Sequence, residues 1–356
     1  MRTALGAAQG FDIAPTEREW GLLMSMASRQ GVMGVAFDGV ERLPHDQRPP
    51  LYLLMDWSGA ADYIEHENRR LNELCVQMCS SFGQTHVKAC ILKGQGMSVL
   101  YPKPLRRSNG DIDVWMAGGK DRVVDYVLQR FPEAKVEGGS RGHHVALAWK
   151  GTAVEVHYWP ARLYRPRHTR QLFRWYRELE KEPWDNEVAL PEGVGEIVVP
   201  RREFNLVFTI VHMFYHWAFE GCGMKQLIDL FWLVKTLDAT DDAEKKRVVK
   251  RLRSLGLGGF LSAMMYVLQV LGLESAHMLC KPNERLGQLL LEDILQVGTV
   301  TAADLADGQY GQEGKVHKFF RRFRRMCRML PMAPSELPWM LAHNVISWMS
   351  GGTRKG

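Results

Sequence analysis

The sequence predicts an α+β protein in which a small mixed sheet lies between an N-terminal helical region and a C-terminal all-helical domain. Two observations predict this class. The spacing of apolar residues is helical, then alternating, then helical again, and a chain of 356 residues is long for a single core. The changes in spacing give an N-terminal helical region (1–84), an α/β core (85–200) and a C-terminal helical domain with a basic tail (201–356).

The first region is expected to be helical. Apolar residues recur three or four positions apart at 16–40 and again at 50–82, as they do on one face of a helix. Three prolines between positions 44 and 50 separate the two stretches, because proline cannot continue a helix. We therefore expect two helical segments joined by a short turn.

Short strands are expected in the middle of the chain. Apolar and polar residues alternate there, with the period of a strand that has one buried face. The segments expected as strands are 88–92, which is a short β-like run, and 110–116, 143–149 and 153–158. The spacing at 121–131 is helical, so strands and a helix interleave as in a small α/β domain. We expect a linker with one edge strand at 181–200 and helices from residue 202 onward.

The positive charge of the chain is concentrated at its end. Residues 1–314 contain 37 Lys and Arg against 39 Asp and Glu, whereas residues 315–356 contain 9 against 1. The segment 315–330 is predicted to form a basic amphipathic helix. Its apolar stripe consists of Phe319, Phe323, Met326 and Leu330. Three partners suit such a helix: its own domain, which is the default, an anionic membrane surface, or a nucleic acid.

The composition predicts neither secretion nor a membrane span. No apolar stretch reaches the roughly 18 uncharged residues that a spanning helix needs, and the N-terminus lacks the apolar run of a signal peptide. The six cysteines are scattered and form no C-x-x-C pair, as in proteins whose thiols stay reduced. We therefore expect a cytoplasmic protein.

Paired carboxylates indicate the candidate site. Asp111 and Asp113 are two positions apart, so a strand places both side chains on the same face. Adjacent carboxylates repel each other unless a cation or a shared proton lies between them, and Mg²⁺ prefers such oxygen ligands together with substrate phosphates. Glu155 lies in the centre of a later strand, where a charge needs a partner. Three carboxylates on one sheet can hold two metal ions.

A glycine-rich turn precedes the paired carboxylates. The segment ILKGQGMSVLY has the pattern of a strand, a turn and the start of a helix. Such a turn presents backbone N–H groups to a phosphate, and Lys93 adds a positive charge beside it. A phosphate cradle followed by paired carboxylates indicates a site for a metal–phosphate ligand.

These segments resemble a known family. The run LKGQGMSVLYPKPLRRSNGDIDVWM (92–116) resembles the signature of the bacterial uncharacterised nucleotidyltransferase family, within the DNA polymerase β-like nucleotidyltransferase superfamily. Two later motifs of that family, E-x-H-W-like and R-x-L-x-D-like, also have counterparts. The matching residues are Glu155, His157, Trp159, Lys225, Leu227 and Asp229. The resemblance covers about residues 86–235.

The resemblance implies a metal-dependent nucleotidyltransferase, which moves a nucleoside monophosphate from a nucleoside triphosphate such as ATP to an acceptor and releases pyrophosphate. It implies that Asp111, Asp113 and Glu155 bind Mg²⁺ or Mn²⁺, and that Glu155 accepts a proton from the acceptor hydroxyl. The residues that it implies in triphosphate binding are Lys93, Gly94, Gly96, Ser98, Arg106, Arg107 and Lys225. Those that it implies along the cleft are His144, His157, His212, His216 and Asp229.

Simpler interpretations stay open for several of these residues. His212 and His216 are four positions apart on a predicted helix, where partly buried, hydrogen-bonded histidines are the safer interpretation. Lys225 and Asp229 have the same spacing, which also suits a plain ion pair on a helix surface. Of the two adjacent histidines on the strand before Glu155, His144 is the one expected to reach the site.

Two alternatives to an enzyme follow from the same features. One is a catalytically silent nucleotide- or partner-binding module with the same fold, and the other is an adaptor that acts through the basic tail. Mutation tests whether the paired aspartates have a role in catalysis. Because the two aspartates repel each other, we expect Asp111→Ala or Asp113→Ala to abolish metal-dependent triphosphate binding with little loss of folding stability.

Overall fold

The N-terminal region is helical, as the sequence predicts. The computed structural model describes residues 1–84, 87–137, 142–219, 221–237, 242–297 and 323–349. The helices of this region are α1 (Glu17–Arg29), α2 (Met33–Glu41) and the long α3 (Leu51–Gln84), with a 3-10 turn at His45–Gln47. A capping box fixes the start of α1, because the Glu19 N–H donates to the Thr16 hydroxyl and the Thr16 N–H donates to the Glu19 carboxylate.

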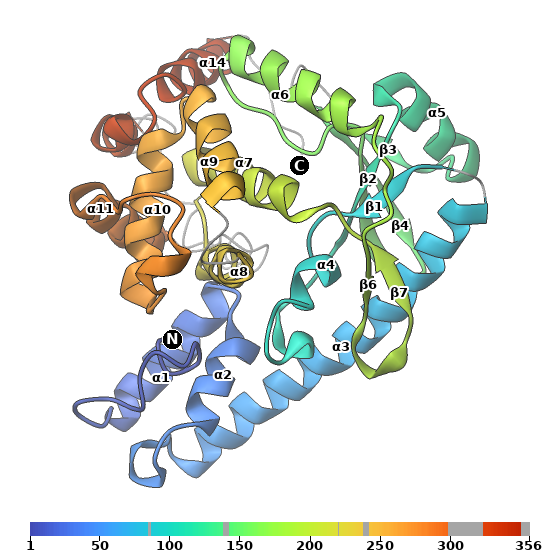
Figure 1. Cartoon of the computed structure of the whole chain (residues 1–356). Helices are drawn as coiled ribbons and strands as arrows, with labels where there is room; N and C mark the ends of the chain where they lie inside the picture. The colour runs from blue at the N-terminus through green and yellow to red at the C-terminus, as the bar shows by residue number, and fades with distance from the viewer. Residues whose placement is uncertain (85–86, 138–141, 220, 238–241, 298–322, 350–356) are drawn as a thin grey trace.

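The middle of the chain forms a mixed five-stranded sheet, which confirms the predicted α+β class (Figure 1). Its strands are β1 (Ala89–Ile91), β2 (Ile112–Met116), β3 (Lys135–Val136), β4 (His144–Trp149) and β5 (Thr152–His157). They lie in the order β1-β2-β5-β4-β3, with β2 and β5 parallel and the other three pairs antiparallel. The hairpin from β4 to β5 turns at Lys150 and Gly151, which both have positive φ, as two-residue hairpin turns require.

The two faces of the sheet pack against different parts of the chain. Ile112 and Val114 of β2 join a core with α3 and α5, whereas Trp115 joins the core of α6 and α7 on the other face. The helices that cover the sheet besides α3 are α5 (Gly119–Arg130), α6 (Pro166–Leu179) and α7 (Arg202–Phe219). Because strand residues alternate between faces, Asp113 lies on the same face as Trp115, toward α7.

The segment predicted as a linker forms a second, two-stranded sheet. Strands β6 (Glu187–Ala189) and β7 (Glu196–Val198) pair as an antiparallel hairpin around a 3-10 turn at Pro191–Gly193. Strand β7 packs on β1 and α3, and Ile197 is buried in the core that contains Leu71. The prediction of a single edge strand was therefore incomplete. Strands of three residues are too short to show a clear alternation in the sequence.

The rest of the described chain is helical, as predicted. Its helices are α8 (Met224–Lys235), α9 (Asp242–Ser254), α10 (Gly258–Leu271), α11 (Glu284–Val297) and α14 (Leu337–Met349), with short 3-10 turns at Ser275–His277 and Leu330–Met332. Trp20 of α1 and Val35 of α2 share one hydrophobic core with Leu268 of α10, so the first two helices pack on the C-terminal helices (Figure 1). None of the described helices combines the length and the apolar character needed to cross a membrane.

The predicted basic helix is described only from residue 323 onward. Phe319 lies outside the described residues. Met326 and Met329 are buried, whereas Phe323 and Leu330 are 41% and 38% exposed. The buried face is therefore displaced from the predicted stripe, because Met329 rather than Leu330 points to the core.

Ion pairs hold this part of the tail on its own domain. The guanidinium of Arg325 donates to both carboxylate oxygens of Asp293 on α11, at 2.7 and 2.6 Å, and to the carbonyl of Trp217 at 2.7 Å. Arg328 lies 3.9 Å from Glu292. Of the three partners that the sequence allows, the structure contains the first, intramolecular docking.

Candidate active site

Two of the predicted carboxylates are direct neighbours in the sheet. Strands β2 and β5 run parallel, and their register pairs Asp113 with Glu155 and Trp115 with His157. Asp111 comes immediately before β2, and its side chain is exposed whereas Asp113 is only 3% exposed. The charges of Asp113 and Glu155 both act on the carboxylate of Asp111. The structure thus places the three acidic groups together at one end of the β2–β5 pair.

Lys93 and His157 hold the buried carboxylate of Asp113. The ammonium of Lys93 lies 2.8 Å from Oδ1 of Asp113, and Nε2 of His157 donates to the same oxygen at 2.9 Å. Nε2 of His157 also lies 3.4 Å from Oε2 of Glu155. The backbone aligns these groups, because the N–H of Leu92 donates to the carbonyl of Asp113 at 2.9 Å. Lys93 therefore already supplies a positive charge among the carboxylates.

These contacts shift the pKa values of the two aspartates in opposite directions. Burial opposes ionisation of Asp113, but Lys93 and His157 outweigh it and hold the pKa of Asp113 well below its usual value. The surrounding protein limits the hydration of Asp111, and this effect, together with repulsion from Asp113, raises the pKa of Asp111. At neutral pH, Asp113 is stabilised as an anion, whereas the charge on Asp111 is unfavourable.

Glu155 and Lys93 are also held in their charged forms. Burial disfavours the charge of Glu155, but the hydrogen bond from His157 outweighs it, so the pKa of Glu155 is lowered. Burial likewise disfavours the charge of Lys93, but Asp113 and Asp111 outweigh it, so the pKa of Lys93 is raised. The site therefore contains three carboxylates around one ammonium group.

His212 and His216 line the same side of the site, on α7. Nε2 of His212 lies 3.2 Å from the ammonium of Lys93 and 3.1 Å from Nε2 of His216. Burial and the charge of Lys93 hold the pKa of His212 well below its usual value, so its ring is neutral and accepts a hydrogen bond from Lys93. Both rings are partly buried and hydrogen-bonded, in agreement with the simpler interpretation, and His212 also contacts a site residue.

The glycine turn lies directly beside Asp111. Gly94 has a φ of 54°, which favours glycine, and a Cβ atom there would lie 3.6 Å from the carbonyl oxygen of Asp111. Gly96 is the second residue of the short helix α4 (Gln95–Ser98) and packs so closely that a Cβ atom would approach the Ile91 carbonyl to 3.2 Å. The Ser98 hydroxyl donates to the Gly94 carbonyl at 3.0 Å. Ser98 therefore braces the turn.

Arg107 forms a buried ion pair with Asp229. Its guanidinium donates to both carboxylate oxygens of Asp229 on α8, at 2.7 Å each, and also to the Asn109 side chain. The hydroxyl of Tyr101 donates to Asp229 at 2.6 Å. This network ties the loop before Asp111 to α8. It takes the place of the surface ion pair between Lys225 and Asp229, which was one of the two interpretations left open by the sequence.

Arg106 points the other way, toward the N-terminal helices. It pairs with Asp38 and Glu41 of α2 at 3.0 and 2.9 Å, and with Glu65 of α3 at 2.6 Å. Three carboxylates thus surround its guanidinium. Arg106 therefore has no part in the nucleotide site that we propose, although the family resemblance implied one.

Lys225 approaches the site without an ion pair among the described residues. Its aliphatic chain lies against Gly31, and its charge is felt by Asp111. Burial and the neighbouring Arg107 lower the pKa of Lys225 more than Asp229 and Asp111 raise it. A lysine in this position is suited to an anionic ligand.

A histidine cluster adjoins the carboxylates on the β4 side. Nε2 of His144 lies 3.7 Å from Oε1 of Glu155. His143, the less favoured of the two adjacent histidines, and Glu137, which the sequence did not point to, extend the cluster. Burial opposes ionisation of Glu137, but the hydrogen bonds from His143 lower the pKa of Glu137 to about 2. Glu137 was missed because it stands alone in the sequence, without a motif.

The acidic residues offer suitable ligands for a divalent cation. One ligand atom from each of Asp113, Glu155 and His157 lies within 4.8 Å of the others. Two carboxylates and an imidazole are ligands that Mg²⁺ or Mn²⁺ accepts, with Asp111 next to them. The ammonium of Lys93 on Asp113 shows that this position attracts a cation.

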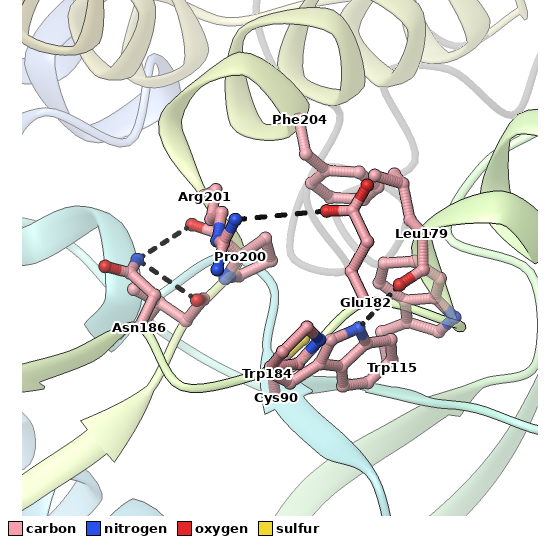
Figure 2. Close-up of a pocket in the computed structure, with 11 residues that line it drawn as sticks. Cys90, Trp115, Leu179, Glu182, Trp184, Asn186, Pro200, Arg201 and Phe204 are labelled. Atoms are coloured by element: carbon pink, nitrogen blue, oxygen red, sulfur yellow. Dashed lines mark hydrogen bonds and ion pairs between the residues drawn. The ribbon is translucent and has the colours of Figure 1, made fainter.

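A separate small crevice lies further along β2. Figure 2 shows Trp115 and Phe204 in its wall; their rings stack with centroids 4.9 Å apart. Trp184 also lines the crevice. Its ring centroid lies 4.4 Å from that of Trp115, and its indole N–H donates to the carbonyl of Leu179. Aromatic packing explains this crevice, and it contains none of the carboxylates of the candidate site.

A mixed sheet that presents carboxylates from neighbouring strands beside a glycine turn is the arrangement of a nucleotidyltransferase core. The chain belongs to the uncharacterised nucleotidyltransferase family, whose sequence profile matches residues 16–272. This match is wider than the predicted resemblance over 86–235. The helices from α1 to α10 are therefore part of what the family shares.

Comparison with other proteins adds little beyond the family. No curated protein matches the chain in sequence. Five chains of solved structures match, among them an antigenic nucleotidyltransferase-like protein from Paracoccidioides brasiliensis. That chain is 14% identical, the match covers 52% of this chain and 88% of that one, and the TM-score is 0.29.

Proposed function

We propose that this protein is a metal-dependent nucleotidyltransferase that transfers a nucleoside monophosphate to an acceptor hydroxyl. The observation that carries the proposal is the pairing of Asp113 with Glu155 on parallel strands, with Asp111 and Lys93 beside them. In the reaction, the acceptor oxygen bonds to the α-phosphorus, the bond between the α-phosphorus and the bridging oxygen breaks, and pyrophosphate leaves. ATP serves as the triphosphate in the tests below.

Asp111, Asp113 and Glu155 would hold Mg²⁺ or Mn²⁺. When bound, such an ion would neutralise triphosphate charge and stabilise the attacking and leaving oxygens. Lys93 and Lys225 would contact the phosphates, and the backbone at Gly94 and Gly96 would approach them closely. These groups bind and orient the triphosphate.

Glu155 would accept the proton of the acceptor hydroxyl. The hydrogen bond from His157 keeps this carboxylate ionised, as a base must be, and the side chain is partly exposed and so reachable. His157 also fixes Glu155 relative to Asp113. Its role is to position the two carboxylates.

Replacing Glu155 with glutamine tests the proposal. A general base contributes about 10²–10⁴-fold to a rate, so we expect Glu155→Gln to reduce turnover by a factor in that range while nucleotide binding survives. Turnover is measured as pyrophosphate release with Mg²⁺ or Mn²⁺ in the presence of small-molecule, protein and RNA acceptors. Binding is measured by calorimetry with Mg²⁺ and ATP.

The controls separate an enzyme from a silent module. His66→Ala changes an exposed residue of α3 and should leave both measurements unchanged. Nucleotide binding without pyrophosphate release under any of these conditions would support the catalytically silent alternative. Absence of Mg²⁺-dependent nucleotide binding in the native protein would refute the proposed function.

The acceptor and any polyanionic partner of the tail are separate questions. An anionic surface or nucleic acid at 315–330 is tested by sedimentation with anionic vesicles and by RNA binding, at low and at physiological salt. Binding through the tail should weaken as salt rises, because screening reduces the attraction of exposed charges. No binding to either at low salt would leave docking on its own domain as the function of this segment.

A further inference from the structure

The histidine cluster beside the carboxylates has a structure of its own. The rings of His143, His144 and His157 are mutual neighbours, with centroids 4.9 to 5.3 Å apart. One ring nitrogen from each lies within 4.8 Å of the other two. Oε2 of Glu137 lies 3.0 Å from Nδ1 of His143 and 3.3 Å from Nδ1 of His144. Three imidazoles and a carboxylate therefore converge from β4, β5 and the end of β3.

Two nitrogens of this cluster, Nδ1 of His144 and Nδ1 of His157, are buried without a hydrogen-bond partner among the described residues. Nε2 of His157 donates to Asp113, so Nδ1 is the ring nitrogen that remains for another ligand. His157 is only 1% exposed, and within the described part of the chain its Nδ1 has no hydrogen-bond partner. A buried polar atom without a partner is unfavourable in the folded protein unless a ligand satisfies it.

We infer that His143, His144, His157 and Glu137 form a second metal site, for a transition metal ion of the Zn²⁺ class. Imidazole nitrogens suit such ions, whereas Mg²⁺ prefers the oxygen ligands of the neighbouring site. Zinc–nitrogen bonds of ~2.0–2.1 Å place tetrahedral ligands about 3.3 Å apart. The three ring nitrogens lie within 4.8 Å of one another, and small rotations of the rings would bring them to that spacing.

His157 links the two sites. Its Nε2 holds Asp113 and Glu155, so an ion on Nδ1 would fix the orientation of the ring and thereby the spacing of the two carboxylates. The histidine site is thus a positioning device next to the acidic site. The two sites share His157, but His143, His144 and Glu137 have no part in the proposed triphosphate site, so binding of an ion to the histidine site can be measured without transferase activity.

The test is a titration of the full-length protein with Co²⁺, in excess Mg²⁺ that fills the oxygen site. We expect one equivalent of Co²⁺ to bind with the visible absorption of a four-coordinate, nitrogen-ligated ion, and Zn²⁺ to displace it. His143→Ala and Glu137→Gln should weaken Co²⁺ binding by about 10- to 100-fold. Asp111→Asn should lose Mg²⁺-dependent ATP binding and keep Co²⁺ binding.

Two further measurements make the outcome decisive. His66→Ala removes an exposed histidine far along α3 and should bind Co²⁺ like the native protein. Circular dichroism shows whether each variant is folded. If His143→Ala does not fold, the milder change Glu137→Gln still tests the site. Native affinity for Co²⁺ in a folded His143→Ala or Glu137→Gln protein would overturn the inference. So would Co²⁺ binding that only Asp111→Asn abolishes.

Discussion

Asp113→Asn and Asp111→Asn are both expected to abolish nucleotide transfer but to change folding stability in opposite directions. Asp113 is buried against Lys93 at 2.8 Å and His157 at 2.9 Å. Removing its charge leaves the ammonium of Lys93 without its main partner, and breaking such a buried pair costs about 3 kcal/mol. Asp111 has a raised pKa, so its ionisation weakens the folded state, and its replacement should hold or raise the melting temperature.

The pH dependence of stability distinguishes the two positions. The pKa of Asp111 is higher in the folded than in the unfolded protein, so its unfavourable effect is absent at low pH and develops as pH rises through that interval. The gain in folding stability from Asp111→Asn should therefore appear near neutral pH and vanish in acid. The pKa of Asp113 is lowered, so its stabilising effect is present at neutral pH and is lost as pH falls toward the folded-state pKa.

Thermal unfolding of the metal-free variants between acid and neutral pH provides the measurement. Asp125→Asn, an exposed change on α5, is the matched control and should unfold like the native protein. Equal losses of melting temperature in Asp111→Asn and Asp113→Asn would contradict the opposite pKa shifts. Calorimetry with Mg²⁺ and ATP tests binding in the same samples.

The sequence predicted the architecture because apolar spacing is a local property. The period changed at residues 88–92 and returned to helical after 200, and the sheet lies in that interval. The same alternation put Asp111 and Asp113 on one face. It did not show that β5 is the parallel neighbour of β2, because strand order depends on contacts between distant segments, and the adjacency of Glu155 was conditional until the register was known.

The contacts of Asp113 change the expectation of little stability loss at that position, for the same reason. Repulsion between neighbouring carboxylates follows from spacing in the sequence, but the cation that relieves it comes from Lys93, on another segment. Adjacent arginines show the limit again: Arg106 turns to α2 and α3, and Arg107 turns to α8. In a three-residue 3-10 turn such as Pro104–Arg106, and in the loop after it, no periodicity assigns a direction to a side chain.

The ion pair between Arg107 and Asp229 should be the most sensitive structural contact near the site. The side chains are only 5% and 9% exposed, and the contact is bidentate. Asp229→Asn would leave a buried guanidinium without its counter-charge, which costs about 3–5 kcal/mol. It would also release the loop that leads to Asp111, so turnover should fall although neither residue touches the proposed triphosphate site.

Urea unfolding tests this prediction against an exposed pair of similar geometry. Arg69 and Glu192 also make a bidentate contact, but both side chains are more than 40% exposed, so Glu192→Gln should unfold like the native protein. The double variant Arg107→Met/Asp229→Leu should recover part of the stability lost in Asp229→Asn, because it removes both charges together. Unfolding of Asp229→Asn at the same urea concentration as Glu192→Gln would show that the buried ion pair does not hold the loop. The position of Asp111 would then depend on the hydrogen bonds of Asn109 with Asn68 and Ser98.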